Sequence, residues 1–322
     1  MIISIIIPVY GIKNYVRKCI KSVISQKNII GLELECIIID DATPDNSISI
    51  IENLLSNYNG RVKFKIIHHE KNKGLSAARN TGIMASKGDY IYFLDGDDFL
   101  EVDCMSNLVQ VLNKYPDVEL IQAGAIARVD SFNLEGRDDL PDYVDDRLWI
   151  KRAFLKRTLF PVTSWNKLIK REFIINNHLF FKEGIIHEDE HWNFFACKYL
   201  SSMAICKRNI YNYVVREGSI MNSDNKKSFY SWLVILGDFI KGIDDFCRKE
   251  QIFQIFERLH PMYVFYPNDI SRKSYGLLND LSLKCTFIGR FTIWIILHLP
   301  FSINRTKIVY KFIINRLLLP LF

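Results

Sequence analysis

The first 127 residues alternate between short apolar runs and stretches of helical spacing, and this alternation limits the possible folds more than any other feature. The run over 2–9 is apolar throughout, which is typical of a strand buried on both faces of a parallel sheet. Further strands are expected at 34–39, 62–66, 90–94 and 118–127. Helices are expected at 14–26, after Thr43-Pro44, at 75–86 and at 103–115. The Ala- and Gly-rich stretch at 75–86 would pack closely on its neighbours. The order predicts an α/β fold with a mixed, largely parallel central sheet.

Length and composition indicate a folded chain of several parts. The chain has 322 residues, of which 49% are hydrophobic and 24% charged, values that exclude intrinsic disorder. We divide it into three parts. Residues 1–127 form the α/β half, and 128–225 contain an acidic loop at 131–146 followed by a mixed segment. Residues 226–322 are mainly helical and end in a basic, apolar tail.

The net charge of +6 is unevenly distributed. Residues 271–322 carry eight Lys and Arg against one Asp, a net charge of +7, which leaves −1 for residues 1–270. Such a near-neutral body argues against nucleic-acid binding. The apolar runs at 287–299 and 303–322 are too short to span a bilayer comfortably, but basic residues beside an aromatic-rich helix favour an anionic membrane surface. The alternative is a helical cap whose apolar face packs on the rest of the chain.

The cysteines and the N-terminus indicate the compartment. The seven cysteines are an odd number without a Cys-x-x-Cys pair, which argues against a disulfide framework and a cysteine-rich zinc site. The apolar N-terminus lacks the basic start and the cleavage site of a signal peptide, and Pro8 interrupts it. These features predict a cytoplasmic protein, and the basic, apolar tail predicts a peripheral position at the inner face of the cell membrane.

Two acidic clusters stand at the ends of predicted strands. They are Asp40-Asp41 and Asp95-Gly96-Asp97-Asp98. Ligands of open α/β sheets bind beyond the carboxyl ends of the strands, and crowded carboxylates need a cation or hydrogen-bond donors. An Asp-x-Asp turn offers the hard oxygen ligands that suit Mg²⁺ or Mn²⁺, which predicts a metal-bound diphosphate ligand. The alternative is that these acids are solvated turn residues.

Four ordered motifs give the chain a specific resemblance. The motifs are Ser4–Tyr10, Ile37–Ser47, Asn72–Gly82 and Gly88–Asp98. With them the chain resembles a family 2 glycosyltransferase with the GT-A fold, of the inverting, bacterial surface-polysaccharide type. Two positions depart from the family pattern: Ala42 stands where Gly is frequent, and Gly11 where Asn is frequent.

The resemblance implies that residues 1–127 bind a nucleotide-sugar donor, and the donor expected from the family is a UDP-sugar. The uracil ring would donate a hydrogen bond to Asp41, and Arg79 would lie near the base or the diphosphate. Asp97 would bind Mn²⁺ or Mg²⁺ directly, with Asp95 near the ribose and the metal. The residues expected to line the nucleotide pocket are Pro8 and Tyr10.

The same resemblance places the catalytic base in residues 128–225. Inverting transfer needs one general base to deprotonate the acceptor hydroxyl. Asp189 matches this base, and Glu188 is the fallback. The flanking segments 165–171 and 211–219 also resemble the family, and Arg216 is a candidate for the diphosphate or for a surface ion pair. The implied acceptor is a glycan or a lipid-linked glycan.

Two other function classes stay open at this point. A non-catalytic protein on the same fold would bind a nucleotide sugar or glycan without transferring it. A zinc hydrolase would use the pattern His187-Glu188-x-x-His191. That pattern requires both histidines on one face of a helix, whereas the local sequence predicts that the helix begins at about Glu188.

Overall fold

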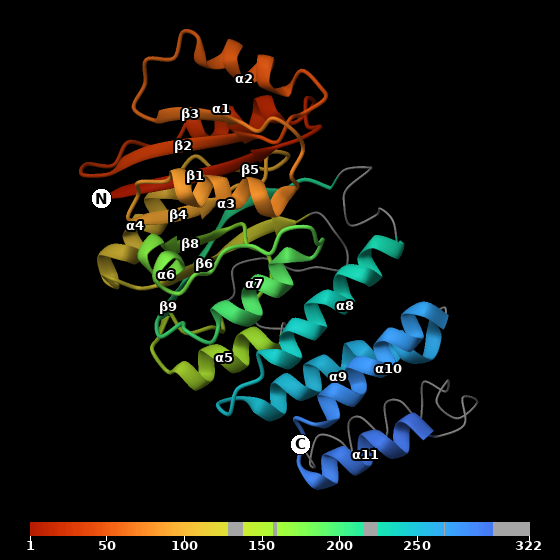
Figure 1. Cartoon of the computed structure of the whole chain (residues 1–322). Coiled ribbons are helices and arrows are strands. Elements are labelled where there is room, and N and C mark those ends of the chain that lie inside the picture. Colours follow the sequence, from red (N-terminus) through yellow and green to blue (C-terminus); the bar gives the residue numbers. More distant parts are fainter. Residues whose placement is uncertain (128–137, 157–159, 216–224, 267, 299–322) are drawn as a thin grey trace. The chain divides into compact units, whose positions relative to one another are not determined.

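The computed structural model describes residues 1–127, 138–156, 160–215, 225–266 and 268–298. The chain divides into two compact units. Unit 1 comprises 1–150, 158–184 and 188–223, and unit 2 comprises 151–157, 185–187 and 224–322. Figure 1 colours both units along the chain.

Unit 1 is built on a mixed sheet of nine strands within the described residues. The strands β1 (Ile2–Val9), β2 (Glu33–Asp40), β3 (Lys63–His68) and β4 (Tyr90–Phe93) are parallel. The strand β8 (Lys167–Lys170) pairs antiparallel with β4 and with β6 (Leu120–Ala127). The other strands are β5 (Phe99–Leu100), β7 (Tyr143–Val144) and β9 (Met203–Tyr213). The order in the sheet is β3-β2-β1-β4-β8-β6-β9-β5, and β7 pairs with β9 outside this order.

The helices of this unit cover both faces of the sheet, which explains why every residue of β1 after Ile2 is buried, Ser4 included. Ile3, Ile5 and Ile7 pack on one face with α1 (Val16–Ile24) and α4 (Cys104–Lys114). The helix α3 (Leu75–Ala85) packs on β1 and β2. A Cβ atom at Gly82 would lie 2.3 Å from Ile6 Cγ2, so the predicted close approach of this Ala- and Gly-rich helix is confirmed. The remaining helices are α2 (Ser47–Leu55), α5 (Arg147–Lys156, which reaches into unit 2), α6 (Arg171–Asn176) and α7 (Glu188–Ala196).

The predicted α/β fold is therefore confirmed, and the five strands expected from the alternation all form. Sequence periodicity missed β5, β7, β8 and β9. Three of these are two to four residues long, too short to show an alternating pattern, and β9 lies in the mixed segment. The expected loop at 131–146 contains β7, and its residues 131–137 lie outside the described residues.

Unit 2 is helical, as expected for the C-terminal region. It contains α8 (Asn225–Lys241), α9 (Arg248–Phe265), α10 (Asn268–Ser282) and α11 (Phe287–His298). Its core includes Phe239, Ile255, Leu259 and Leu278, all fully buried. None of the helices in the described part of the chain combines the length and apolar character needed to cross a bilayer. The apolar run over 303–322 lies outside the described residues.

Candidate active site

Both acidic clusters lie at one edge of the sheet. The strands β2 and β4 run parallel to β1 on either side of it, so their carboxyl ends open at the same edge. Asp40 ends β2, and Asp95 and Asp97 belong to the turn after β4. This is the edge at which open α/β sheets bind ligands.

Gly96 determines how closely the Asp95–Asp97 turn approaches β1. A Cβ atom at Gly96 would lie 2.3 Å from Ile12 Cδ1 and 2.8 Å from the carbonyl oxygen of Pro8. Both distances are too short for a real side chain, so only glycine fits. The turn therefore lies directly against the end of β1, next to Pro8. Two residues further on, Tyr10 is 49% exposed, so its ring is accessible to a ligand.

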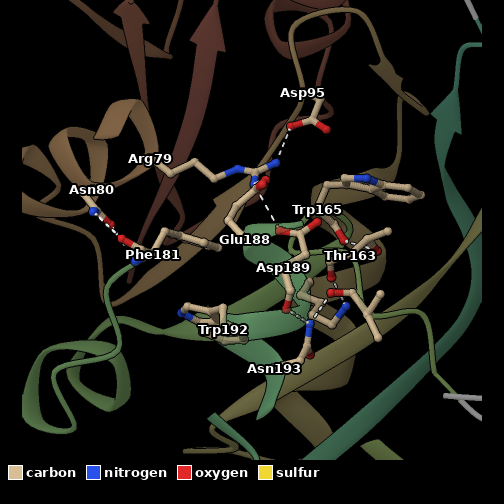
Figure 2. A network of polar contacts seen from close by, with 12 residues as sticks. Arg79, Asn80, Asp95, Thr163, Trp165, Phe181, Glu188, Asp189, Trp192 and Asn193 are labelled. Atoms are coloured by element: carbon tan, nitrogen blue, oxygen red, sulfur yellow. Dashed lines mark hydrogen bonds and ion pairs between the residues drawn. The ribbon is translucent and has the colours of Figure 1, made fainter. Parts of the chain in front are cut away.

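Arg79 connects this turn to the start of α7 (Figure 2). Its Nη2 donates to Asp95 Oδ1 at 2.9 Å, and its Nη1 donates to Glu188 Oε1 at 2.7 Å and to Asp189 Oδ1 at 3.1 Å. The guanidinium is only 1% exposed. A buried cation requires such partners, and charge-assisted hydrogen bonds of this length are strong and directional. Arg79 thus bonds two carboxylates that lie more than 100 positions away from it in the sequence.

Neighbouring contacts hold Arg79 in place. Asn80 donates from Nδ2 to the Phe181 carbonyl at 2.9 Å and accepts the Phe181 N–H at 2.8 Å. The Phe181 ring lies 5.3 Å from the Arg79 guanidinium carbon and stacks on Trp192 of α7 at 5.8 Å. These contacts tie α3 to α7 through Phe181, which restricts the rotamers of Arg79.

The carboxylates outnumber the guanidinium that neutralises them. Burial, followed by the charge of Asp189, raises the pKa of Glu188 to about 7, although Arg79 opposes the shift. Burial also raises the pKa of Asp95, and Arg79 again opposes the shift. For Arg79, burial disfavours the charged form, but Asp189, Asp95 and Glu188 outweigh it and raise its pKa. The site therefore has spare negative charge that an added cation would offset.

The Asp95–Asp97 turn fits part of a metal site. It presents two carboxylates separated by one glycine, the hard oxygen ligands that Mg²⁺ and Mn²⁺ take. Within the described ranges, no group of three or more His, Cys, Asp and Glu side chains is arranged to hold a metal ion. A metal at this turn would need further ligands from its substrate, which is how magnesium sites commonly bind phosphates.

Asp98, the last acid of the cluster, has a structural role. It is buried, and it accepts hydrogen bonds from the Tyr211 hydroxyl at 2.6 Å and from the Val214 N–H at 2.7 Å. Burial and the charges of Asp95 and Asp97 raise the pKa of Asp98 to about 8. The Tyr211 oxygen also accepts the Asp95 N–H at 3.2 Å, so Asp98 and Tyr211 together stabilise the turn.

Asp41 organises the loop before α3. It is buried, and its carboxylate accepts the N–H groups of Lys73 and Gly74, both at 2.8 Å. Its Oδ1 also lies 2.7 Å from Nδ1 of His69, whose Nε2 lies 2.9 Å from Thr81 Oγ1. The contacts rigidify Asp41 at the strand end. Its role toward a uracil ring stays a prediction.

Two departures from the family pattern have one structural explanation. Ala42 has φ +53° and Gly11 has φ +64°, so both occupy the left-handed region. Glycine and asparagine adopt this region most easily, which accounts for the residues that are frequent at these positions. Ala42 is the strained choice of the two. Gly11 donates its N–H to Thr43 Oγ1 at 2.8 Å, which joins the loops after β1 and β2.

A buried lysine and an asparagine hold the segment 161–163 beside Asp189. Lys167 on β8 donates from Nζ to the carbonyls of Pro161, at 3.0 Å, and Thr163. Asn193 donates from Nδ2 to the Val162 carbonyl and, at 2.8 Å, to the Asp189 carbonyl. Three successive carbonyls are thus fixed against the helical turn that carries Asp189.

Lys167 should make the stability of the protein depend on pH. Burial lowers its pKa to about 7, with Asp189 opposing, against about 10.5 for an unfolded lysine. The charged form therefore destabilises the folded state below pH 7, and this penalty is relieved as the pH rises to about 10.5, by up to about 1.4 kcal/mol per pH unit. We expect the wild type to gain about 2 kcal/mol in unfolding free energy over Lys167→Met between pH 7 and 9, measured by urea titration.

A matched variant controls this measurement. Lys170→Met, on the same strand, removes a partly exposed lysine that pairs with Asp117 at 3.1 Å. Its unfolding free energy should follow the wild-type pH dependence. Parallel curves for the wild type and Lys167→Met would contradict a depressed pKa at Lys167.

The histidine pattern lacks the geometry of a zinc protease. The helix α7 begins at Glu188, and His187 has φ +65°, so it stands before the helix in a conformation that the helix cannot continue. The His187 Nε2 lies 2.7 Å from Ser228 Oγ, whereas the His191 ring packs at 4.8 Å on Phe195. The requirement for two histidines on one helical face is not met.

Sequence reasoning found the acids of this site but missed several residues that hold them. Arg79 was expected near the donor, whereas its contacts to Glu188 and Asp189 were not anticipated. The signal that could have found Lys167 and Tyr211 was their place in the two flanking segments of the resemblance. Arg216 lies outside the described residues.

Comparison with a family model gives one match, over residues 4–175, to the family described as "Glycosyl transferase family 2". The matched range contains Arg79, Asp95 and Lys167 and ends before α7. EpsH of Bacillus subtilis (strain 168), which its name provisionally calls a glycosyltransferase, is 31% identical over 238 residues. These cover 72% of this chain and 66% of EpsH, just under two thirds of that relative.

Solved structures show the same fold at low identity. S. aureus TarS 1–349 in complex with UDP-GlcNAc superposes with a TM-score of 0.71 at 16% identity, over 97% of this chain and 89% of that one. The mannosyltransferase PcManGT from Pyrobaculum calidifontis, in complex with GDP-Man and Mn²⁺, gives a TM-score of 0.53 at 13% identity, over 97% and 85% of the two chains. These similarities establish the architecture.

Proposed function

The chain belongs to glycosyl transferase family 2, and from this premise we propose that it transfers a sugar from a nucleotide-sugar donor, a UDP-sugar, to a hydroxyl group of a glycan or lipid-linked glycan. The reaction would break the bond between the anomeric carbon and the leaving diphosphate and form a bond to the acceptor oxygen. It would invert the anomeric centre. The TarS complex with UDP-GlcNAc supports a UDP-linked donor.

The observation that carries this proposal is the position of Arg79. Its guanidinium bonds Asp95 at the metal-type turn and Asp189 at the start of α7. An inverting transferase needs a leaving-group site and a base on opposite sides of the reacting carbon, held at a fixed separation. Arg79 supplies that link, because it orients both carboxylates from one buried side chain.

Asp97, with Asp95, would hold Mn²⁺ or Mg²⁺ together with the donor diphosphate. The Mn²⁺ in the PcManGT complex supports this choice of metal class. Such an ion, when bound, supplies positive charge to the leaving diphosphate. The chain itself contributes the rigid turn. Gly96 allows the turn to lie directly against the end of β1, and the hydrogen bond between Asp98 and Tyr211 stabilises it.

Asp189 would accept the proton of the acceptor hydroxyl. It is half-buried, whereas Glu188 beside it is buried and has a pKa raised to about 7. A base must be ionised before the reaction, and it must reach the acceptor. Asp189 is the more accessible of the two, and the raised pKa of Glu188 counts against Glu188 as the ionised base. Glu188 instead shares Nη1 of Arg79 with Asp189.

A donor screen tests the proposal. We expect UDP-GlcNAc, UDP-glucose or UDP-galactose to raise the melting temperature of the protein, and Mn²⁺ to strengthen the effect. The same donor should release UDP when a panel of alkyl glycosides is added as acceptors. Stabilisation by GDP-mannose alone would overturn the UDP assignment. Stabilisation by a UDP-sugar without release of UDP would instead favour the non-catalytic binding protein.

We further propose that the protein acts in the cytoplasm at the inner face of the cell membrane. The net charge of +7 over 271–322 supports an anionic partner, since lipid phosphates attract juxtamembrane Lys and Arg. A lipid-linked acceptor would be presented at this surface.

A further inference from the structure

The helix α11 carries a row of exposed aromatic rings. Phe287 is 84% exposed, and Phe291 and Trp294 are each 55% exposed. Their spacing of four and three residues places them on one helical face. His298 continues the row: its ring lies 4.5 Å from Trp294, which stacks on Phe291 at 6.0 Å. We call these four residues the aromatic stripe.

The stripe is separate from the face that anchors α11 in unit 2. Gly289, Ile293 and Leu297 follow one another at intervals of four residues and are buried. The Tyr263 hydroxyl of α9 donates to the Leu297 carbonyl at 3.4 Å. The helix is therefore already packed through one side, and the Phe and Trp rings on the other side leave more than half of their surface exposed. An exposed row of large apolar side chains indicates a surface that meets a partner.

The charge around the stripe selects the kind of partner. Residues 281–298 contain no Asp or Glu, and Arg290, which lies between Phe287 and Phe291 in sequence, is exposed. Trp and Phe beside basic residues suit the boundary between lipid headgroups and acyl chains, where rings insert and cations meet phosphates. A second copy of the chain is disfavoured, because a symmetric contact through this face would bring Arg290 toward its own counterpart.

We propose that the aromatic stripe of α11 docks in the plane of an anionic lipid bilayer. The helix has 12 residues, which corresponds to about 18 Å and is shorter than the ~30 Å hydrocarbon core, so it lies along the surface. Phe287, Phe291 and Trp294 insert into the interface, and Arg290 pairs with lipid phosphates. The helix α11 is then the segment through which the protein contacts the membrane, whichever sugar donor it uses.

Sedimentation of the full chain with vesicles tests the proposal. We expect binding to vesicles of phosphatidylglycerol and phosphatidylcholine, and weaker binding to phosphatidylcholine alone. The triple variant Phe287→Ser, Phe291→Ser, Trp294→Ser should lose at least a hundredfold in vesicle affinity, since each inserted ring contributes on the order of tenfold. Arg290→Glu should lose affinity mainly at low salt. The matched control is Tyr199→Ser, which removes an aromatic ring that is 48% exposed in unit 1 and should bind as the wild type does.

Three results would overturn the proposal. The first is vesicle binding by the triple variant that equals wild-type binding. If deletion of 299–322 also abolishes binding in that case, the tail docks and the stripe does not. Another is a wild-type dimer in analytical ultracentrifugation that the triple variant loses, which would assign the stripe to a second copy. The third uses brominated lipids, which quench the fluorescence of tryptophan inserted in a bilayer, and it needs no triple variant. Quenching in the wild type that is absent in Trp294→Phe places Trp294 in the bilayer. Equal quenching in both proteins excludes that position and overturns the proposal. Donor-dependent UDP release can persist in each case, so the membrane proposal and the catalytic proposal fail separately.

Discussion

Asp97→Ala is expected to lower metal-dependent transfer by at least about a thousandfold, a loss of about 4 kcal/mol in transition-state stabilisation. Asp97 is half-buried in the turn after β4, and the adjacent Asp98, not Asp97, bonds Tyr211 and Val214. Removal of the Asp97 carboxylate should therefore cost the donor site its metal while the turn keeps its supports.

Calorimetric titration separates this effect from unfolding. Asp97→Ala should melt within a few degrees of the wild type and should lose the Mn²⁺ dependence of UDP binding. Asp103→Ala is the control, since it removes a half-exposed aspartate elsewhere in unit 1 whose only ion pair is a 3.8 Å contact to Lys27 among those that the structure describes. Full activity of Asp97→Ala would refute its assignment as the metal ligand.

Asp189→Asn is expected to reduce turnover by about 10²–10⁴-fold with donor affinity nearly unchanged. The amide oxygen of Asn can still accept the hydrogen bond from Arg79, so the ion-pair cluster keeps its shape while the base is lost. The proposed donor site lies at the other end of the cluster, near Asp95, so donor affinity should not change. The initial rate of UDP release gives the turnover, and isothermal titration calorimetry with UDP gives the affinity of the donor site.

Glu188→Gln is the companion variant. It retains a hydrogen-bonding partner for Arg79 and leaves Asp189 in place, so a smaller loss of turnover is expected. A severe loss in Glu188→Gln with a mild loss in Asp189→Asn would transfer the role of base to Glu188. A parallel loss of donor affinity in Asp189→Asn would count against any role as base.

The sequence allowed the α/β fold of residues 1–127 to be predicted, because periodicity is a local property. The strand ending at Asp40 and the one preceding Asp95 could be located from neighbouring residues alone, and parallel pairing brings their ends together. The partners of Arg79 could not be found in this way. They lie 16, 109 and 110 positions away, and only packing of α3 against α7 decides which carboxylates its guanidinium meets.

The burial of Lys167 also could not be predicted from the local sequence. In sequence it is one basic residue of a segment with several, and nothing local distinguishes it from Lys170 three positions later. The structure buries Lys167 and leaves Lys170 partly exposed. That difference decides which of the two lysines fixes the 161–163 segment beside Asp189.

The sharing of Arg79 among three carboxylates has an evolutionary consequence. A mutation that removes Asp95, Glu188 or Asp189 also changes the charge balance for the two that remain, so the effects of mutations at these sites should not add. Loss of Arg79 itself would leave three carboxylates crowded without their cation. The four residues therefore form an epistatic group, and a descendant of this chain that abandons catalysis is expected to lose them together rather than one at a time.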